Sequence, residues 1–419
     1  MKEIRAKKLR TVNGKTLLVT VDISKRTDVG YYRCPDGVEV KPFEFWNNGR
    51  GFNTFWHRIF KAKEAHNLDE IVVGFESTGP YGEPLLHYLR KRGVKLVQVN
   101  PMHTKRVKEL QGNSPNKTDQ KDPKVIADII ELGHALSVVL PEGAQAELRR
   151  LTQARERSIQ RRTALFNQLQ DIVFIIFPEF SQVMKDVKTK SAQYLLKFYP
   201  TPQSIVRYGL ESLALTLRKI SRGKLNKERA KRLYEAAGES VGIKEGQESI
   251  LFEIKEILAN IEASERFITE VEQHISHHLK QVPYSKFILS IKGIKEITAA
   301  GIIGEVGDFS KFDTIAEIEK LAGLDLFEIS SGKHKGNRRI SKRGRPLMRK
   351  LLYFASLNVV RKGGIMHQYY HKCLERGMVK MKALIAVARK LLGVIFALVR
   401  DHSKYIEDYS KTENLKEAV

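Results

Sequence analysis

Four acidic residues in the first third of the chain could hold a divalent cation. Asp22 closes the apolar run Thr-Leu-Leu-Val-Thr-Val-Asp, and Glu76 closes Ile-Val-Val-Gly-Phe-Glu. Asp119 and Asp122 stand three residues apart in Asn-Lys-Thr-Asp-Gln-Lys-Asp. Neighbouring carboxylates raise each other's pKa and repel unless a cation lies between them. Two metal ions bridged by carboxylates can stabilise the attacking and leaving oxygens of a phosphoryl transfer. We therefore predict one divalent-metal site for phosphoryl transfer.

Each acid also has a purely structural interpretation. Asp22 could simply end a strand, and Asp122 could cap a helix whose first residue is Pro123. For a single acid this interpretation is the stronger one. Four acids, each at the expected end of an element, favour the metal site instead. The helix cap stays open as the alternative for Asp122.

The elements that must position these acids alternate along the first 140 residues. Apolar and β-branched runs predict strands at 16–22, 30–34, 38–43, 71–75 and 95–99. Helical spacing predicts helices at 52–66, 84–92 and 123–132. Three sequential strands followed by alternation predict a mixed sheet, antiparallel on one side and parallel on the other. This order fits an α/β ribonuclease-H-like (RuvC-like) fold, in which the first and fourth strands are neighbours.

The charge balance predicts a polyanionic partner. Lysine and arginine number 73 against 48 acids, a net charge of +25. Nucleic acid is the simplest such partner, and an anionic membrane surface is the alternative. We expect no membrane association, because no apolar run reaches the ~18 residues of a spanning helix and the N-terminus lacks a signal-peptide core. Cys34 and Cys373 show no ligand spacing, which predicts a reduced, cytoplasmic protein without structural zinc or disulfides.

Two long helices are predicted in the middle of the chain. The first starts near Ala144 and carries many arginines. The second has an apolar seam in which spacings of three and four alternate, at Ile254, Ile257, Ile261, Ser264, Ile268, Val271 and Ile275. The seam fits an intramolecular helical hairpin and a dimerising coiled coil equally well. The segment between the helices, 180–245, is basic and predicted helical, without an assigned role.

Two stretches in the last third predict contacts to nucleic acid. Residues 290–300 place a glycine turn before a small-residue helix, which resembles half of a helix-hairpin-helix, with Lys292 and Lys295 beside Gly293. From Lys333 to Lys350 there are nine lysines and arginines and no acid, which predicts salt-sensitive binding. The candidate contacts in this run are Lys333, Lys335, Arg338, Arg339, Lys342, Arg343 and Arg345. A solvated basic loop is the alternative.

Taken together, these motifs resemble the DEDD-type transposases of insertion sequences, relatives of the Piv invertases and of bridge-RNA-guided recombinases. Residues 16–135 carry Val-Asp-Ile-Ser-Lys, Glu-Ser-Thr-Gly-Pro-Tyr, Val-Asn-Pro and Asn-Lys-Thr-Asp-Gln-Lys-Asp. Residues 286–400 carry Ile-Lys-Gly-Ile-Lys-Glu-Ile-Thr-Ala-Ala, Leu-Ala-Gly-Leu, Ser-Gly-Lys and Ile-Ser-Lys-Arg-Gly-Arg-Pro-Leu-Met-Arg-Lys. The sequence departs from the family at Pro123, where alanine is usual, and at Lys292 and Lys295, where proline and glycine are usual.

The resemblance implies roles for particular residues. By position, Asp22, Glu76, Asp119 and Asp122 match the family's acidic tetrad, which binds Mg²⁺, with Mn²⁺ as the alternative ion. Ser331 matches the serine nucleophile that attacks the scissile phosphate, and Ser330 beside it is the alternative. The resemblance also implies DNA as substrate, a homodimer or homotetramer as the assembly, and for some members an element-encoded guide RNA.

The resemblance also implies an organisation in four segments. We expect a RuvC-like catalytic domain at 1–140 and a helical, coiled-coil region at 141–284. A mainly α transposase domain is expected at 285–405, followed by a tail at 406–419. Three functions remain as hypotheses: a recombinase that uses metal and serine together, a junction-resolving metal nuclease that uses water, and a non-enzymatic nucleic-acid-binding protein.

Overall fold

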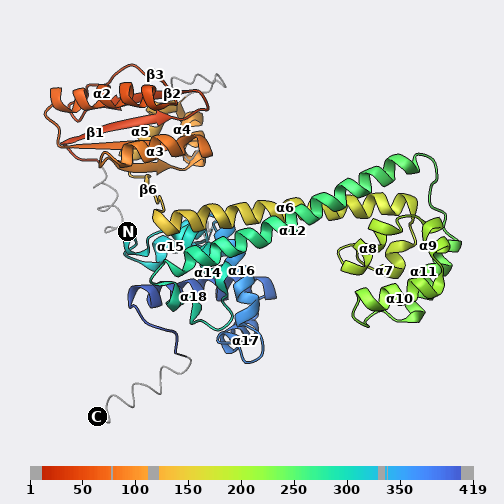
Figure 1. The fold of residues 1–419 in the computed structure, drawn as a ribbon. Coiled ribbons are helices and arrows are strands. Elements are labelled where there is room, and N and C mark those ends of the chain that lie inside the picture. The colour runs from red at the N-terminus through yellow and green to blue at the C-terminus, as the bar shows by residue number, and fades with distance from the viewer. Residues whose placement is uncertain (1–11, 77–78, 112–121, 329–335, 337, 407–419) are drawn as a thin grey trace, which may run out of the picture. The chain divides into compact units, whose positions relative to one another are not determined.

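The chain folds into two units, which a computed structural model describes for residues 12–76, 79–111, 122–328, 336 and 338–406 (Figure 1). The contacts divide it into Met1–Val139 and Leu140–Val419.

A six-stranded mixed sheet forms the first unit, with the strand order β3-β2-β1-β4-β5-β6. Its strands are β1 (Thr16–Asp22), β2 (Thr27–Arg33), β3 (Phe43–Trp46), β4 (Glu70–Glu76), β5 (Lys95–Val99) and β6 (Leu136–Ser137). Strands β1, β2 and β3 pair antiparallel, β1, β4 and β5 pair parallel, and β6 is antiparallel to β5. The mixed sheet and the neighbouring first and fourth strands are confirmed.

The predicted third strand was wrong. Within 38–42 the only β pairing is an isolated bridge between Arg33 and Glu39, and the third strand begins at Phe43. Pro42 explains the shift, because proline has no N–H to donate to a ladder. The second strand also begins earlier than predicted, at Thr27.

Helices cover both faces of this sheet: α2 (Gly49–Ala65), α3 (Glu83–Arg90), α4 (Pro101–Gln111) and α5 (Asp122–Glu131), with a 3-10 turn at Pro80–Gly82. The face of Gly30 meets α2, because a methyl group there would lie 3.1 Å from the Phe55 ring. The face of Gly74 meets α5, where a methyl group would lie 2.1 Å from Ile130 Cδ1. Gly74 thus lets α5 approach the middle of the sheet closely.

An antiparallel helical hairpin organises the second unit. Its arms are α6 (Gly143–Ile176) and α12 (Gln247–Lys280). Arg155 pairs with Glu272, and Gln168 pairs with Glu253 further along, so the two arms run in opposite directions. All seven predicted seam residues of α12 are buried. The intramolecular hairpin is therefore the observed arrangement, and the dimerising coiled coil stays a hypothesis.

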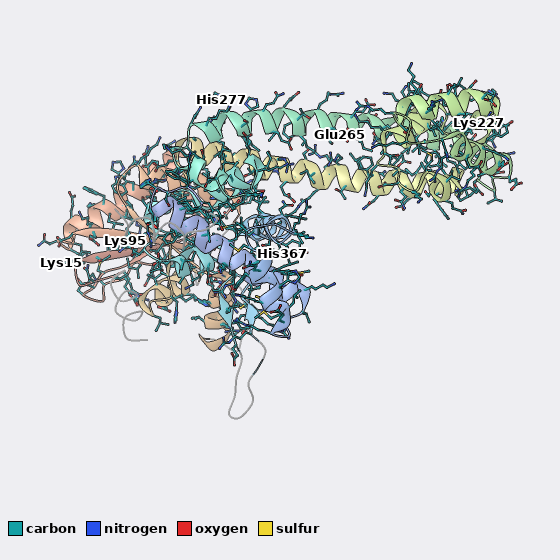
Figure 2. All side chains as sticks on the ribbon, turned by 90° about the horizontal axis from the view of Figure 1, so that it is seen from below. Lys15, Lys95, Lys227, Glu265, His277 and His367 are labelled. Carbon is teal, nitrogen blue, oxygen red and sulfur yellow. The ribbon has the colours of Figure 1, made fainter. Side chains whose placement is uncertain are left out.

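Five short helices close the far end of the hairpin, where Figure 2 labels Lys227. They are α7 (Phe180–Met184), α8 (Lys190–Phe198), α9 (Pro202–Tyr208), α10 (Leu210–Ile220) and α11 (Lys227–Gly238). Their apolar side chains share one core with the ends of α6 and α12, including Phe166, Ile176, Leu195 and Ile257. The helical character predicted for 180–245 is confirmed.

The other end of the hairpin packs into the C-terminal helices. These are α13 (Ser285–Leu289), α14 (Glu296–Val306), α15 (Ile315–Ala322), α16 (Pro346–Val359), α17 (His367–Glu375) and α18 (Lys380–Arg400), with a 3-10 turn at Phe309–Lys311 and short strands β7 (Leu326–Phe327) and β8 (Arg339–Ile340). Leu148 of α6 and Ile275 of α12 belong to the same core as Ile303 and Leu391. The predicted segments 141–284 and 285–405 therefore share a hydrophobic core. None of the helices in the described ranges is long and apolar enough to cross a membrane.

Candidate active site

Asp22 and Glu76 end two adjacent parallel strands. In the register of β1 and β4, Val21 pairs with Phe75, and the two acids occupy the next position on each strand. Paired residues of a parallel ladder point to the same face of the sheet. The two acids therefore lie at the same end of neighbouring strands and on the same face of the sheet, and both residues are half-buried.

Asp122 joins the same face from α5. The Thr20 hydroxyl, two residues before Asp22, donates a 2.6 Å hydrogen bond to the carbonyl oxygen of Pro123. Side chains two residues apart on a strand share a face, so Asp22 points toward the side that carries the start of α5. The fold thus gathers Asp22, Glu76 and Asp122 in one region. Asp119 lies outside the described residues.

Lys108 of α4 forms an ion pair with Asp122, with 2.5 Å between Nζ and Oδ2, and the Asp122 side chain is only 16% exposed. A cation is therefore already favoured beside this carboxylate. Oxygen donors from three acids are the ligand type that Mg²⁺ and Mn²⁺ accept. The residues present fit a divalent cation, which would compete with the Lys108 ammonium for Asp122. Nothing in the sequence pattern singled out Lys108.

Asp28 is a buried acid close to this site, on the opposite face of the sheet, and no sequence signal singled it out. It is fully buried on β2, and its Oδ1 accepts a 2.8 Å hydrogen bond from the Ser24 amide. Its Oδ2 is buried and makes no hydrogen bond within the described part of the chain. Burial, together with the nearby charge of Asp22, raises the pKa of Asp28 to about 6. Asp28 fixes the loop that leaves Asp22. Only its place six residues after Asp22 could have suggested it.

Replacing Asp28 by asparagine should change how stability depends on pH. The folded pKa of about 6 exceeds the ordinary value of 3.8, so between these values the folded state holds a proton that the unfolded state has lost. The contribution of Asp28 to stability is therefore full below about pH 4 and is lost as pH rises through 6, by roughly 2–3 kcal/mol.

Urea unfolding of wild type and Asp28→Asn, in chelator at several pH values between 4 and 7.5, measures this difference. The variant should gain stability relative to wild type as pH rises. Parallel profiles for the two proteins would contradict the assignment.

The predicted glycine turn lies between α13 and α14. Gly293 has φ +107°, a conformation that favours glycine, and a methyl group there would lie 3.1 Å from Val359. Lys292 and Lys295 flank it and are exposed. The turn thus presents two lysines to solvent beside a helix start, a geometry compatible with a phosphate contact.

The basic stretch divides into exposed and interior residues. Arg339, Lys342 and Arg343 are exposed around β8, and exposed Arg338 pairs with Glu328 at 2.9 Å. Ser330, Ser331, Lys333 and Lys335 lie outside the described residues.

Arg345 is directed inward. Its guanidinium donates to the carbonyl oxygen of Glu305 and lies 3.6 Å from the Glu305 carboxylate, which is almost fully buried. Burial and the nearby charge of Arg149 lower the pKa of Arg345 to about 10. This placement anchors the start of α16 to α14 and does not support the predicted DNA contact of Arg345.

Two family models match separate parts of the chain. Residues 19–178 match the model of DEDD transposases of the IS110 type, described as Transposase. Residues 285–371 match the model described as Transposase IS116/IS110/IS902 family. The first match contains the four predicted acids, and the second contains the glycine turn, Ser331 and the basic stretch.

Proteins of insertion elements are similar over most of the chain. The insertion element IS116 uncharacterized 44.8 kDa protein of Streptomyces clavuligerus is 25% identical over 80% of this chain and 84% of its own. The insertion element IS110 uncharacterized 43.6 kDa protein of Streptomyces coelicolor is 22% identical over 92% and 94%. The transposase for insertion sequence element IS1111A of Coxiella burnetii is 24% identical over 84% of each chain.

Proposed function

The chain belongs to the IS110 family of DEDD transposases, and we propose that it cuts and rejoins DNA at the ends of an insertion sequence by metal-assisted serine attack. The observation that carries this proposal is the register of β1 and β4, which puts Asp22 and Glu76 at the ends of adjacent parallel strands, with the start of α5 held on the same face by Thr20. The adjacency of β1 and β4 supports a ribonuclease-H-like fold for the first unit.

The four acids would hold the metal ion that contacts the scissile phosphate. We assign Asp22, Glu76, Asp119 and Asp122 as ligands of Mg²⁺, with Mn²⁺ as a substitute. When bound, the metal would stabilise charge on the phosphoryl oxygens. Asp28 holds the loop behind Asp22 through the Ser24 amide, which keeps the Asp22 carboxylate at the strand end. Lys108 would balance the charge of Asp122 until the cation and DNA arrive.

Ser331 is proposed as the nucleophile. Its hydroxyl oxygen would form a bond to phosphorus while the bond from phosphorus to the leaving strand's oxygen breaks. The hydroxyl proton would pass to a base, and the leaving oxygen would later take one up. The resulting phosphoserine link conserves the bond energy needed to rejoin DNA. Its place within the second matched segment, beside the basic stretch, supports this assignment.

Nucleic-acid binding would draw on the exposed lysines and arginines of the second unit. A net charge of +25 supports a polyanionic substrate. We further propose an element-encoded guide RNA, assembly as a homodimer or homotetramer, and action in the cytoplasm. These proposals rest on the family resemblance.

Recombination in vitro tests the proposed function. The full-length protein is mixed with DNA that spans the ends of its element, with RNA co-purified from the host, in Mg²⁺ or in chelator. Joined products that require Mg²⁺ are expected, and RNase treatment should abolish them if RNA guides the reaction. Cleavage without joining would favour a nuclease that uses water. If the element transposes in cells but the purified protein binds its DNA without cleaving it, both enzymatic assignments would be contradicted.

A further inference from the structure

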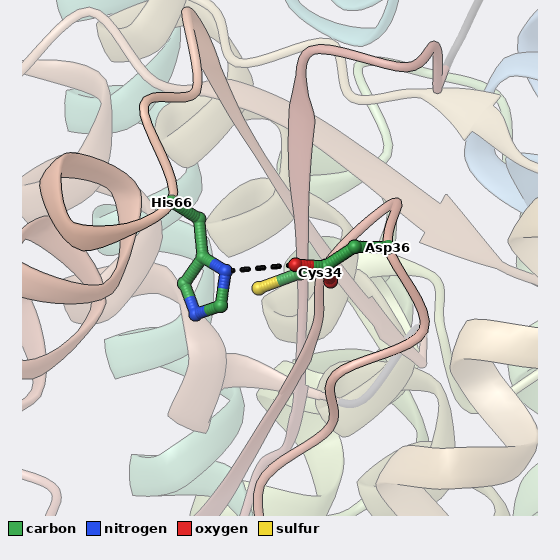
Figure 3. Close-up of side chains that lie close together, drawn as sticks. All are labelled: Cys34, Asp36 and His66. Carbon is green, nitrogen blue, oxygen red and sulfur yellow. Dashed lines mark hydrogen bonds and ion pairs between the residues drawn. The ribbon is translucent and has the colours of Figure 1, made fainter.

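Three side chains of metal-ligating type meet at the end of the sheet opposite the acids. Cys34 directly follows β2, whose last residue Arg33 pairs with Leu18 near the beginning of β1. Asp36 lies in the next turn, and His66 directly follows α2. One ligand atom from each residue lies within 4.8 Å of the others. Figure 3 shows the thiol, the carboxylate and the imidazole converging.

A tight turn sets two of these ligands. The Gly37 amide donates to the Cys34 carbonyl oxygen at 3.1 Å, and the Cys34 amide donates to the Val38 carbonyl oxygen at 2.8 Å. Asp36 Oδ1 accepts from the Val38 amide at 3.0 Å. Pro35 fixes its own φ, and Gly37 adopts φ +88°. The turn therefore holds the thiol and the second carboxylate oxygen in place before any ligand binds.

His66 brings the third donor from a different element. Its amide donates to the carbonyl oxygen of Ala62 and so continues the hydrogen bonding of α2. Its Nδ1 lies 3.0 Å from Asp36 Oδ2. The end of α2 and the turn after β2, far apart in sequence, are thereby joined at this cluster.

We propose that Cys34, Asp36 and His66 form a second metal site, specific for a borderline-soft transition metal such as Zn²⁺ and separate from the acidic site. Sulfur, imidazole nitrogen and carboxylate oxygen are the three donor types that Zn²⁺ takes, and three protein ligands leave a fourth position for water. Mg²⁺ is excluded by the thiol, because hard cations select oxygen ligands.

The observed spacing is close to what such a site needs. With bonds of about 2.0 Å to nitrogen and oxygen and about 2.3 Å to sulfur, tetrahedral ligands lie roughly 3.3–3.6 Å apart. The Asp36–His66 pair is already at 3.0 Å, and the Cys34 sulfur lies within 4.8 Å of the other two ligand atoms, so a shift of the side chains would bring it into range. Cys34 is 3% exposed, whereas the Asp36 and His66 side chains are 54% and 27% exposed. The sulfur ligand is thus buried, whereas the carboxylate and imidazole ligands are accessible to a metal ion from solvent.

Cobalt substitution tests the site without relying on transposition. Co²⁺ bound by a thiolate gives a sulfur-to-cobalt charge-transfer absorption in the near ultraviolet, which carboxylates do not give. The full-length protein, freed of metal by chelation, is titrated with Co²⁺ and then with Zn²⁺. We expect the band to appear with one equivalent and Zn²⁺ to displace it.

Matched variants assign the ligands. Cys34→Ser should abolish the band, and His66→Ala should weaken Co²⁺ binding by more than about tenfold. Cys373→Ser and His57→Ala should leave the band unchanged, since Cys373 is buried in α17 and His57 lies elsewhere on α2. The proposal is overturned if wild type shows no band, or if the band survives Cys34→Ser. Because His66 is partly exposed, its variant should fold even if the cysteine variant does not.

Discussion

Replacing Glu76 by glutamine is expected to reduce DNA strand cleavage by roughly a thousandfold or more, about 4 kcal/mol of transition-state stabilisation. The change keeps the size of the side chain and removes one negative charge from the end of the sheet at which Asp22 and the start of α5 also lie. Two remaining acids attract a dication less strongly, and the phosphoryl oxygens lose stabilisation as their charge develops. Single-turnover cleavage of labelled element DNA at saturating Mg²⁺ measures the loss.

Glu70→Gln is the matched control for that variant. Glu70 begins the same strand, β4, at the opposite end, and is exposed. Its replacement should leave the cleavage rate within about twofold, because exposed surface substitutions rarely matter. Equal losses of cleavage rate in the two variants would show that the effect depends on negative charge anywhere on β4. That result would contradict a specific role for Glu76.

Replacing Gly304 by alanine is expected to destabilise the second unit strongly. A methyl group there would lie 2.6 Å from the backbone nitrogen of Arg149 and 2.7 Å from its Cα, because α14 crosses α6 closely at this point. Backbone cannot move aside as a side chain can, so the two helices must separate. Overpacking costs about 1–3 kcal/mol, and a clash with backbone belongs at the upper end of this range, above the ~1 kcal/mol that alanine gains as a helix former. Thermal unfolding should show a melting temperature lowered by several degrees.

Gly393→Ala should have the opposite effect on stability. Gly393 also lies inside a helix, α18, but a methyl group there would meet Ile315 at an ordinary 3.9 Å. Without a clash, the helix propensity of alanine should raise the melting temperature by about 2–4 °C. If both substitutions shift the melting temperature in the same direction, close packing at the α14–α6 crossing is not the cause.

The mixed sheet, and the positions of Asp22 and Glu76 at the ends of neighbouring strands, could be predicted because their signals are local. Apolar runs ending in Asp22 and Glu76 mark buried strands with a polar end, and the order of elements makes those strands neighbours. The third strand was predicted too early because Val38 and Val40 are typical strand residues, whereas Pro42 after them interrupts the ladder. The hairpin seam was visible from its spacing, but spacing alone does not say whether the partner helix lies in the same chain.

The contacts that the sequence could not predict are those between distant segments. Lys108 meets Asp122 because α4 and α5 pack together. Arg345 turns inward because Glu305, forty residues earlier, presents a buried carbonyl oxygen and carboxylate. Cys34 and His66 meet only once α2 lies beside β2, so the sequence spacing of the cysteines gave no indication of ligands. Charge and residue type are not enough to separate such interior partners from surface contacts.

The most direct test of the central claim is a covalent-adduct assay with the neighbouring serine variants. Full-length protein, labelled element DNA, host RNA and Mg²⁺ are incubated and separated on a denaturing gel. We predict a protein–DNA adduct that Ser331→Ala and Glu76→Gln both abolish and that Ser330→Ala retains. An adduct lost with Ser330→Ala instead would move the nucleophile by one residue. Cleaved DNA without an adduct, unaffected by Ser331→Ala, would contradict serine attack and identify the acidic site as that of a nuclease using water.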